Sequence, residues 1–505
     1  MAKSKKSRPT LAHHIPTDDP PYAHLIRNNN QPLDSEVDEI LLIIQDAKKR
    51  LAEQANGLQP EARKESKALR ALIKTCTKII HPVRRLPFEI ISEILLQTLS
   101  GPYDWDNYPA VHDYFRGPWA YSEVCRRWRD VALKLPHLWS ELSAPSNCGP
   151  YWLHVKNPIG RMKLWLHRSR SAPLRILYDG QWGKHGPKEH ETITSLLFEQ
   201  SERWEVFRWI GCSDPGRFGR LSEVVGRVPL LRHLDVQYIV AGGPQEPARA
   251  VSFAGFTALQ PHLVRFHAER FLVDPFKLLG IAPNLEDLAL VLNPAHDDIP
   301  RKWFPLSRLT HSGIQRLVVD HPYMIALPYL ILPQLKCLGL RSFALDDLYL
   351  ITALIIQSRC PLTKLFVQGK YHFHWSLVQV LQANPILEDL TLVGDESMPL
   401  YQYQESILEQ LTIREGIPDL LPALKTFSCD VRGVDPKALV AMLESRCERG
   451  HLRKVTLWSA QTPVKKWVSA RLLRRVKDLG KKGVQVVVAD IPWSYSSLKM
   501  QDLME

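Results

Sequence analysis

The stretch PNLEDLAL at residues 283–290 contains the pattern that decides the fold of this chain. Its last two leucines, Leu288 and Leu290, stand two residues apart, which is the period of a β-strand. Related P-x-L-x-x-L-x-L copies occur at 229–236, 261–268, 333–340, 385–392 and 422–429, and looser copies at 203–209, 313–319, 361–367 and 451–457. The apolar triplets of these ten copies start 21 to 37 residues apart. Each copy can bury its apolar face only against its neighbours, so stacking of the copies is expected to supply the core.

Any single copy also fits an α-helix, because L-x-x-L places both leucines on one helical face. Ten copies that each end in strand-like alternation favour strands. The pattern resembles an irregular leucine-rich repeat, in which each unit gives one short strand and a return segment that is often helical. The resemblance implies a solenoid over residues 201–492, closed by a C-terminal cap of one helix and one strand near 464–490. The expected fold class is therefore α/β.

The alternate, non-core positions of these strands are expected to line the concave face of the solenoid. They carry both signs of charge and few aromatic side chains, which favours a protein ligand over nucleic acid. The candidate target-binding residues are His233, Asp235, Arg265, His267, Arg316, Asp320, Lys364 and Phe366. A solvated face that binds nothing remains the alternative at each position. Because exposed substitutions usually change stability little, charge reversal at Arg265, Arg316 or Lys364 is expected to leave the melting temperature nearly unchanged.

Upstream of the repeats, two apolar stripes at helical spacing occupy residues 33–80. The first runs through Val37, Ile40, Ile44, Ala47 and Leu51, and the second through Leu69, Leu72, Cys76 and Ile79. They predict two helices that form either an antiparallel hairpin or a short coiled coil. Residues 1–32 lack periodicity and are expected to be a disordered arm. Residues 143–200 are interpreted as a transition with a first repeat-like segment, and 493–505 as a tail.

Between these regions the chain reads VRRLPFEIISEIL at 83–95 and VCRRWRDVALKLPHLWSEL at 124–142. Pro87 suits the first turn of a helix that places Ile91 and Leu95 on one face and Ile90 and Ile94 on a neighbouring one. This apolar surface is wider than one-sided packing requires. The spacing of Val124, Trp128, Val131 and Leu135 predicts a second helix, which ends at Pro136. The alternative for any one of these apolar residues is that it belongs to the core of a small helical bundle and contacts no partner.

Taken in order, LP-x-EI-x-x-EIL, VCRRWRDVA and P-x-LW resemble the F-box motif in the form typical of fungal F-box proteins. The resemblance implies an F-box-like helical domain at 81–142 that docks onto the adaptor Skp1 and, through it, onto a cullin in a ubiquitin ligase. The Skp1-binding residues that it implies are Leu86, Pro87, Ile90, Ile91, Ile94, Leu95, Val124, Cys125, Trp128, Leu138 and Trp139. The aromatic-rich insertion at 101–119 departs from a minimal F-box.

Composition and motifs favour binding over catalysis. The chain has 505 residues, of which 45% are hydrophobic and 23% charged, as in ordinary globular proteins. Its net charge of +12 would suit nucleic acid only if it were concentrated on one surface, whereas the basic runs lie near the N-terminus and at 464–482. No Cys-x-x-Cys pair and no common catalytic or nucleotide-binding motif is present, and the close pair His372 and His374 lacks a third ligand. We therefore expect no catalytic residue, no metal and no cofactor.

The sequence also lacks an apolar leader and a stretch long enough to span a bilayer, so we expect no membrane association and an intracellular location in cytoplasm or nucleus. The function expected from the resemblance is non-catalytic recognition of a protein target for a Skp1–cullin–F-box ligase. The alternatives are a leucine-rich-repeat scaffold outside any ligase and a basic nucleic-acid-binding protein. A mere cap on the repeats should bury Trp128, Ile90 and Ile94, whereas a receptor should leave an apolar surface exposed.

Overall fold

The structure is a computed structural model of the chain. It describes residues 22–28, 30–53, 60–99, 116–145, 157–179, 187–211, 220–221, 223–224, 226–237, 262–292, 299–342, 344, 347–369, 377–394, 407–432, 434–459, 464 and 468–489. These residues fall into two compact units. The helical unit comprises the described residues of Met1–Leu99, His112–Ser140 and Trp165–Arg170, and the ladder unit comprises those of Glu141–Leu164 and Ser171–Glu505.

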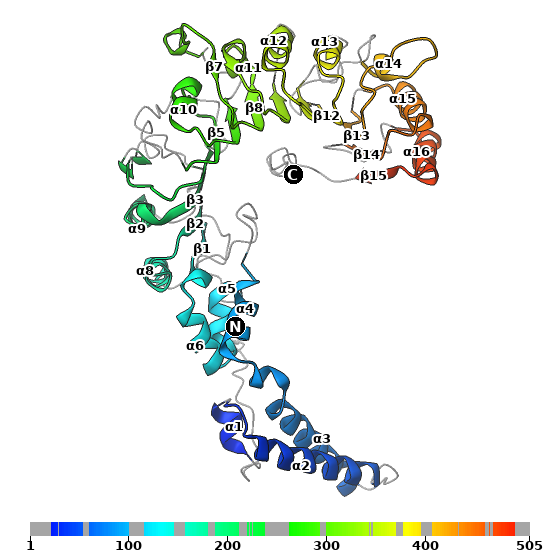
Figure 1. The fold of residues 1–505 in the computed structure, drawn as a ribbon. Coiled ribbons are helices and arrows are strands. Elements are labelled where there is room, and N and C mark those ends of the chain that lie inside the picture. The colour runs from blue at the N-terminus through cyan, green and yellow to red at the C-terminus, as the bar shows by residue number, and fades with distance from the viewer. Residues whose placement is uncertain are drawn as a thin grey trace, which may run out of the picture. The chain divides into compact units, whose positions relative to one another are not determined.

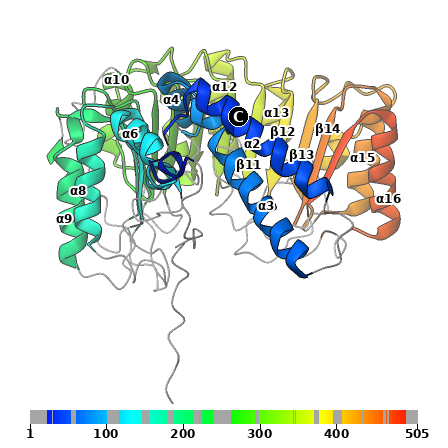
Figure 2. The ribbon, with the colours of Figure 1, turned by 90° about the horizontal axis from the view of Figure 1, so that it is seen from below.

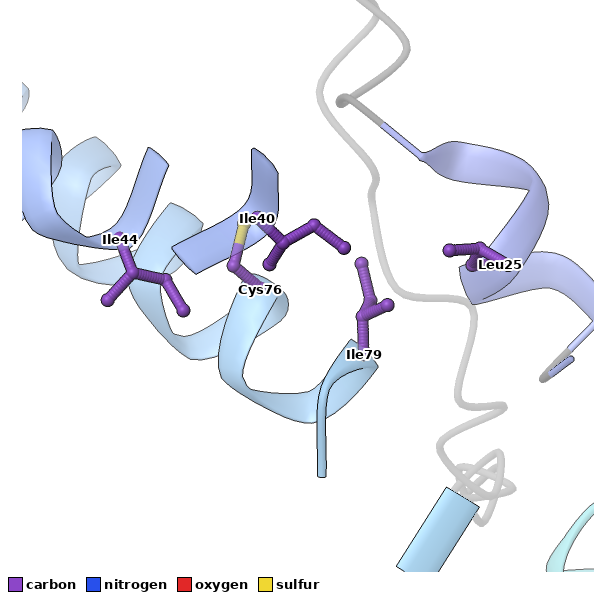
Figure 3. Packing of buried hydrophobic residues seen from close by; sticks show 5 residues of the cluster. All are labelled: Leu25, Ile40, Ile44, Cys76 and Ile79. Atoms are coloured by element: carbon purple, nitrogen blue, oxygen red, sulfur yellow. The ribbon is translucent and has the colours of Figure 1, made fainter. Parts of the chain in front are cut away.

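The helical unit begins with a helical hairpin. Its helices are α1 (Ala23–Asn28), α2 (Asp34–Glu53), α3 (Pro60–Ile79), α4 (Phe88–Leu96), α5 (Gly117–Val124) and α6 (Arg126–Lys134), with short 3-10 turns η2 (Pro82–Arg85) and η4 (Pro136–Trp139). Figure 3 shows Ile40 and Ile44 of α2 facing Cys76 and Ile79 of α3, with Leu25 of α1 in the same buried cluster. Within the chain, α2 and α3 therefore pack against each other as a helical hairpin.

The ladder unit is built on one parallel sheet of thirteen strands. Its strands are β1 (Glu141–Pro145), β2 (Leu174–Asp179), β3 (Trp204–Ile210), β4 (His233–Gln237), β5 (Arg265–Glu269), β6 (Asp287–Val291), β8 (Arg316–Asp320), β10 (Cys337–Arg341), β11 (Lys364–Gln368), β12 (Asp389–Val393), β13 (Thr426–Asp430), β14 (Lys454–Trp458) and β15 (Gln485–Ala489). Each strand pairs with the strands that precede and follow it in this order, and β7 (Leu309–Thr310) with β9 (Leu330–Ile331) forms a separate pair.

The connections between these strands carry the helices. They are α8 (Pro158–Arg168), α9 (Pro187–Phe198), α10 (Pro275–Ile281), α11 (His321–Met324), α12 (Leu348–Ser358), α13 (Leu377–Gln382), α14 (Ile407–Leu411), α15 (Pro436–Glu448) and α16 (Ala470–Asp478), and the end of α8 belongs to the helical unit. In Figure 1 the helices α10 to α16 follow one another on one side of the sheet. Figure 2 shows α15 and α16 side by side next to β14.

Strand alternation divides the sheet into two faces. The second and fourth residues of β5, β6 and β8 are buried on the helix side, including Leu288 and Leu290 of the PNLEDLAL stretch. The first, third and fifth residues lie on the opposite side, which we call the inner face. The strand phase inferred from the repeats is therefore confirmed for Leu288, which is buried in the sheet core.

The expected α/β class is confirmed, and three details of the predicted organisation differ. The disordered arm was placed at 1–32, but Ala23–Asn28 is helical and Leu25 is buried in the hairpin core. The sheet starts at β1, which crosses the predicted boundary between 81–142 and 143–200 and lies well before residue 201. A continuous helix from Val124 was predicted, but the backbone of Cys125 is extended and separates α5 from α6. Most of the insertion at 101–119, His372, His374 and the tail at 493–505 lie outside the described residues.

Candidate protein-interaction surfaces

Helix α4 carries two distinct apolar faces. Ile91 and Leu95 are fully buried, whereas Ile90 and Ile94 are 47% and 41% exposed. Pro87 precedes the helix, is also exposed, and stands three residues before Ile90. Residues three and four apart share one face of a helix. Pro87, Ile90 and Ile94 therefore form one exposed apolar row, which we call the α4 stripe.

The segment that leads into α4 is fixed by side-chain hydrogen bonds from α6 and η2. Arg127 donates from Nη1 to the carbonyl oxygen of Arg84 at 2.6 Å and from Nη2 to that of Leu86. Arg84 in turn donates to the carbonyl oxygen of Leu25 at 3.0 Å, which ties this segment to the hairpin. Burial lowers the pKa of the Arg84 guanidinium. These bonds hold the start of α4 in place without using its exposed apolar atoms.

The break between α5 and α6 gives two of the predicted residues different environments. Cys125 is the N-cap of α6, and its Sγ accepts a long hydrogen bond from the Trp128 amide at 3.5 Å. Val124 ends α5 and is 59% exposed, whereas Trp128 is half-buried. Val124 and Trp128 therefore do not share one helical face, as the predicted continuous helix required.

Three tryptophans form the centre of this unit. Trp119, Trp139 and Trp165 meet edge to face with ring centroids 5.1 to 5.8 Å apart. Trp139 donates to the carbonyl oxygen of Ala132, and Trp165 donates to that of Trp139, both at 2.8 Å. The Arg168 guanidinium lies 4.5 Å from the Trp139 ring centroid and 4.9 Å from that of Trp119, a cation–π arrangement. Trp139 therefore stabilises the unit from within.

The residues predicted to bind Skp1 thus separate into a surface set and a core set. Pro87, Ile90, Ile94 and Val124 are exposed, while Ile91, Leu95, Leu138 and Trp139 are buried. Leu86, Cys125 and Trp128 are half-buried. The prediction did not include Phe88, which is 38% exposed and lies under the Lys134 ammonium at 5.8 Å. The sequence could have suggested Phe88 as a surface residue, because it lies within the LPFEI motif.

On the ladder unit, the inner face is lined by ion pairs that run across the strands. Asp287 of β6 has a side chain that is 2% exposed, and it lies between Arg265 of β5 and Arg316 of β8. Arg316 donates to both Asp287 carboxylate oxygens. Arg175 of β2 likewise pairs with the buried Glu141 and with the half-buried Glu205, each at 3.0 Å. The predicted contact residues Arg265 and Arg316 are therefore both partners of the buried Asp287 carboxylate.

A third network occupies the middle position of the strands. Asp235 of β4 forms an ion pair with Arg208 of β3, with 3.0 Å between Asp235 Oδ2 and Arg208 Nε, and pairs with His267 Nδ1 at 2.9 Å. Burial alone would raise the pKa of Asp235, but the charges of His267 and Arg208 hold this pKa below its usual value. Asp235 thus stays ionised, with its charge compensated within the sheet.

Burial shifts the pKa of two other inner-face groups. Burial, aided by the charges of Arg265, Arg232 and Arg175, lowers the pKa of His233 to about 3, so its imidazole is neutral near pH 7. Burial raises the pKa of Asp320 well above its usual value, although Arg341 opposes this shift. The His233 imidazole therefore offers no positive charge to a ligand at neutral pH.

The structure also gives the exposure of each residue that was expected to bind the target. Asp320 and Phe366 are buried, and Arg265, Arg316, Asp235, His267 and His233 are half-buried. Lys364 is partly exposed beside Asp389, whose pKa is raised by burial. Charge reversal at Arg265 or Arg316 would place a second carboxylate against buried Asp287, so the structure leads us to expect a lower melting temperature where the sequence led us to expect no change. Sequence reasoning missed Glu141, Arg175, Glu205, Arg208 and Asp287.

Further features bear on the class of the protein. Within the described ranges, no three His, Cys, Asp or Glu side chains gather in a metal-binding arrangement. The helices described by the structure are all too short or too polar to cross a membrane. The described residues thus form a mixed α/β protein, with a parallel sheet of thirteen strands and a separate helical unit. No protein-family model matches it, and a search of curated proteins finds no similar sequence.

Proposed function

We propose that this chain is the non-catalytic target-recognition subunit of a Skp1–cullin–F-box ubiquitin ligase. In this proposal the α4 stripe binds a Skp1-like adaptor, and the ladder unit is an irregular leucine-rich-repeat solenoid that binds the protein target. Ubiquitin transfer would depend on proximity, because a tethered target reaches a high effective concentration near the charged ubiquitin carrier.

The observation that carries this proposal is the exposure of Ile90 and Ile94 next to the fully buried Ile91 and Leu95. The helix already has a complete core face, so the second apolar row is surplus to the packing of the unit. Exposed apolar rows on a folded unit are typical of protein-interaction sites. The row lies in the segment that resembles the F-box motif, and a cap that only closes the repeats would have no need of it.

The ladder unit supports the second part of the proposal. Its strands are all parallel and adjacent in sequence order, and their alternate residues bury a continuous core. Stacked supersecondary units of this kind present one long face for binding. The paired charges of the inner face argue against a nucleic-acid groove, since phosphate binding requires uncompensated positive charge.

The test replaces Ile90 and Ile94 together by Glu and identifies co-purifying proteins by mass spectrometry. A carboxylate on the α4 stripe should abolish recovery of the adaptor and the cullin, because it cannot be desolvated in an apolar interface. The melting temperature should stay near that of the wild type, because both side chains are exposed. Ile386→Glu is the matched control, since Ile386 is 48% exposed on the ladder unit, and it should keep adaptor recovery.

Recovery of the adaptor with the double variant at wild-type level would overturn the ligase proposal. If neither the wild type nor the variants recover an adaptor but all recover the same target protein, the chain is instead a scaffold outside any ligase.

A further inference from the structure

The last strand of the sheet has one open side. Among the described strands, β15 pairs only with β14 and ends the order of the sheet. The Gln485 amide donates to the carbonyl oxygen of Arg453 at 2.8 Å. Successive residues of a parallel strand form their hydrogen bonds to opposite sides, so the amides and carbonyls of Val486 and Val488 point away from β14. These backbone groups form an edge to which a further strand can be added.

The apolar core is also incomplete at this edge. From β4 to β14 the second and fourth residues of the sheet strands are buried, as Val455 and Leu457 of β14 are, at 0% exposed. The corresponding residues of β15, Val486 and Val488, are only half-buried, and Val487 between them is 36% exposed. The strand contains neither a charged residue nor a proline, the residues that usually block strand addition. An added strand would cover its valines with apolar side chains.

The helix that leads into β15 is strongly basic. Residues 470–482 contain six cations and a single carboxylate, that of Asp478. One of these cations is compensated by the neighbouring helix α15, because Arg475 Nε donates to Glu444 at 2.8 Å. Asp478 is itself paired with Lys481, at 2.8 Å. The segment therefore keeps an excess of positive charge.

Part of this excess lies at the end of the ladder unit. Arg474 and Lys477 have no ion-pair partner among the described residues, and their spacing places them on one face of α16. Lys477 follows Arg475 by two residues, about 200° around the helix, so it points away from α15. Since α16 is the last helix of the row (Figure 1), this face has no further helix beside it among the described residues.

The charge also decides between two occupants of the edge. A second copy joined edge to edge about a twofold axis would place its own α16 beside this one, and their positive charges would repel. A segment that carries carboxylates would instead be attracted by Arg474 and Lys477. The charge therefore favours an acidic partner over a second copy of the chain.

We propose that the β15 edge binds an acidic, extended segment of another protein. The segment adds a strand through the outward backbone groups of Val486 and Val488, and its apolar side chains cover these two valines. Carboxylates next to the added strand contact Arg474 and Lys477. Nucleic acid would match the charge but offers no strand for the edge and no aliphatic side chains for the valines. This site is separate from the α4 stripe and does not depend on adaptor binding.

The first test asks whether the edge is open in the full-length chain alone. Hydrogen exchange followed by mass spectrometry at single-residue resolution should show that the amides of Val486 and Val488 exchange at least about tenfold faster than that of Val487, which bonds to β14. Equal protection of the three amides would mean that the edge is already covered, and it would overturn the proposal.

The second test uses a fluorescein-labelled peptide of three glutamates, one glycine and a strand of alternating valine and threonine. Its binding to the full-length chain is followed by fluorescence anisotropy, and it should slow exchange of the Val486 and Val488 amides. Val486→Pro removes an outward amide, which an edge strand tolerates, and should weaken binding at least about tenfold. Val486→Thr keeps the amide and is the matched control. A peptide that fails to bind the wild type, or binds Val486→Pro equally well, would contradict the proposal.

The charge is tested with Arg474→Glu and Lys477→Glu together, which should weaken binding of this peptide at least about tenfold. The matched control reverses two exposed cations of η8 (Arg301–Trp303), Arg301→Glu with Lys302→Glu, and should leave binding unchanged. Equal binding to both double variants would show that the charge of α16 does not attract the segment, and the proposal would fail.

Two other results would assign the surface to a different occupant. A wild-type dimer that Val486→Pro dissociates in analytical ultracentrifugation would assign the edge to a second copy. A single-stranded oligonucleotide that displaces the peptide from the wild type and binds Val486→Pro equally well would assign the basic face to nucleic acid. Either result would overturn the proposal. None of these outcomes involves the adaptor, so failure here leaves the proposed function to its own test.

Discussion

The α4 stripe and the inner face are both candidate binding surfaces, but their side chains are held in opposite ways. Ile90 and Ile94 are exposed, and the core of the helical unit is formed by other residues, such as Ile91 and Trp139. On the inner face, Arg265 and Arg316 face outward from the sheet core yet neutralise the buried Asp287. Substitution of the stripe should therefore change binding alone, whereas substitution of the ion pairs should change stability first.

The largest effect should come from Asp287→Ala. Its removal leaves Arg265 and Arg316 without their shared carboxylate, and loss of one partner from a buried ion pair costs about 3 kcal/mol. Urea unfolding should show this loss. Glu388→Ala is the matched control, because its pair with Lys425 is 43% and 39% exposed and contributes less than about 1 kcal/mol. Equal effects of the two substitutions would show that the inner-face pairs are only surface charges.

An intermediate effect should come from His233 and depend on pH. Its folded pKa of about 3 lies below the ordinary value near 6.5, so between these values the unfolded chain binds a proton that the folded chain does not. Stability should fall as the pH falls through this window, by up to about 1.4 kcal/mol per pH unit. His233→Gln should flatten that dependence in urea unfolding, and His262→Gln, at an exposed histidine, should not. The same slope in both variants would mean that His233 titrates normally.

The sequence predicted the strands of the inner face but not the ion pairs on it. The strand phase followed from Leu285, Leu288 and Leu290, because side chains along a strand point alternately to its two faces. This alternation can be seen in a few consecutive residues of the sequence. The ion pairs could not be predicted, because Asp287 and Arg316 stand 29 residues apart and meet only through the register of β6 and β8. Strand β1 was missed because ELSAP lacks the leucine triplet of the repeats.

In the helical unit, the sequence indicated which residues are apolar but not which of them are exposed. Ile90 and Ile91 are adjacent and chemically identical, yet one is 47% exposed and the other fully buried. The extended backbone at Cys125 was also hidden, since Val124 and Trp128 have the spacing of one continuous helix. Tertiary packing determines which isoleucine is exposed and where the helix is interrupted, and helical periodicity alone predicts neither.

We propose that the exposed row of α4, and not its buried row, binds the adaptor. Titration of a purified Skp1-like adaptor into the wild type and into Ile90→Ser with Ile94→Ser tests this proposal. We expect this double variant to change the free energy of unfolding by less than about 0.5 kcal/mol. We also expect its affinity to fall at least about tenfold, because two apolar side chains are lost from the interface. Wild-type affinity in the variant would contradict the account.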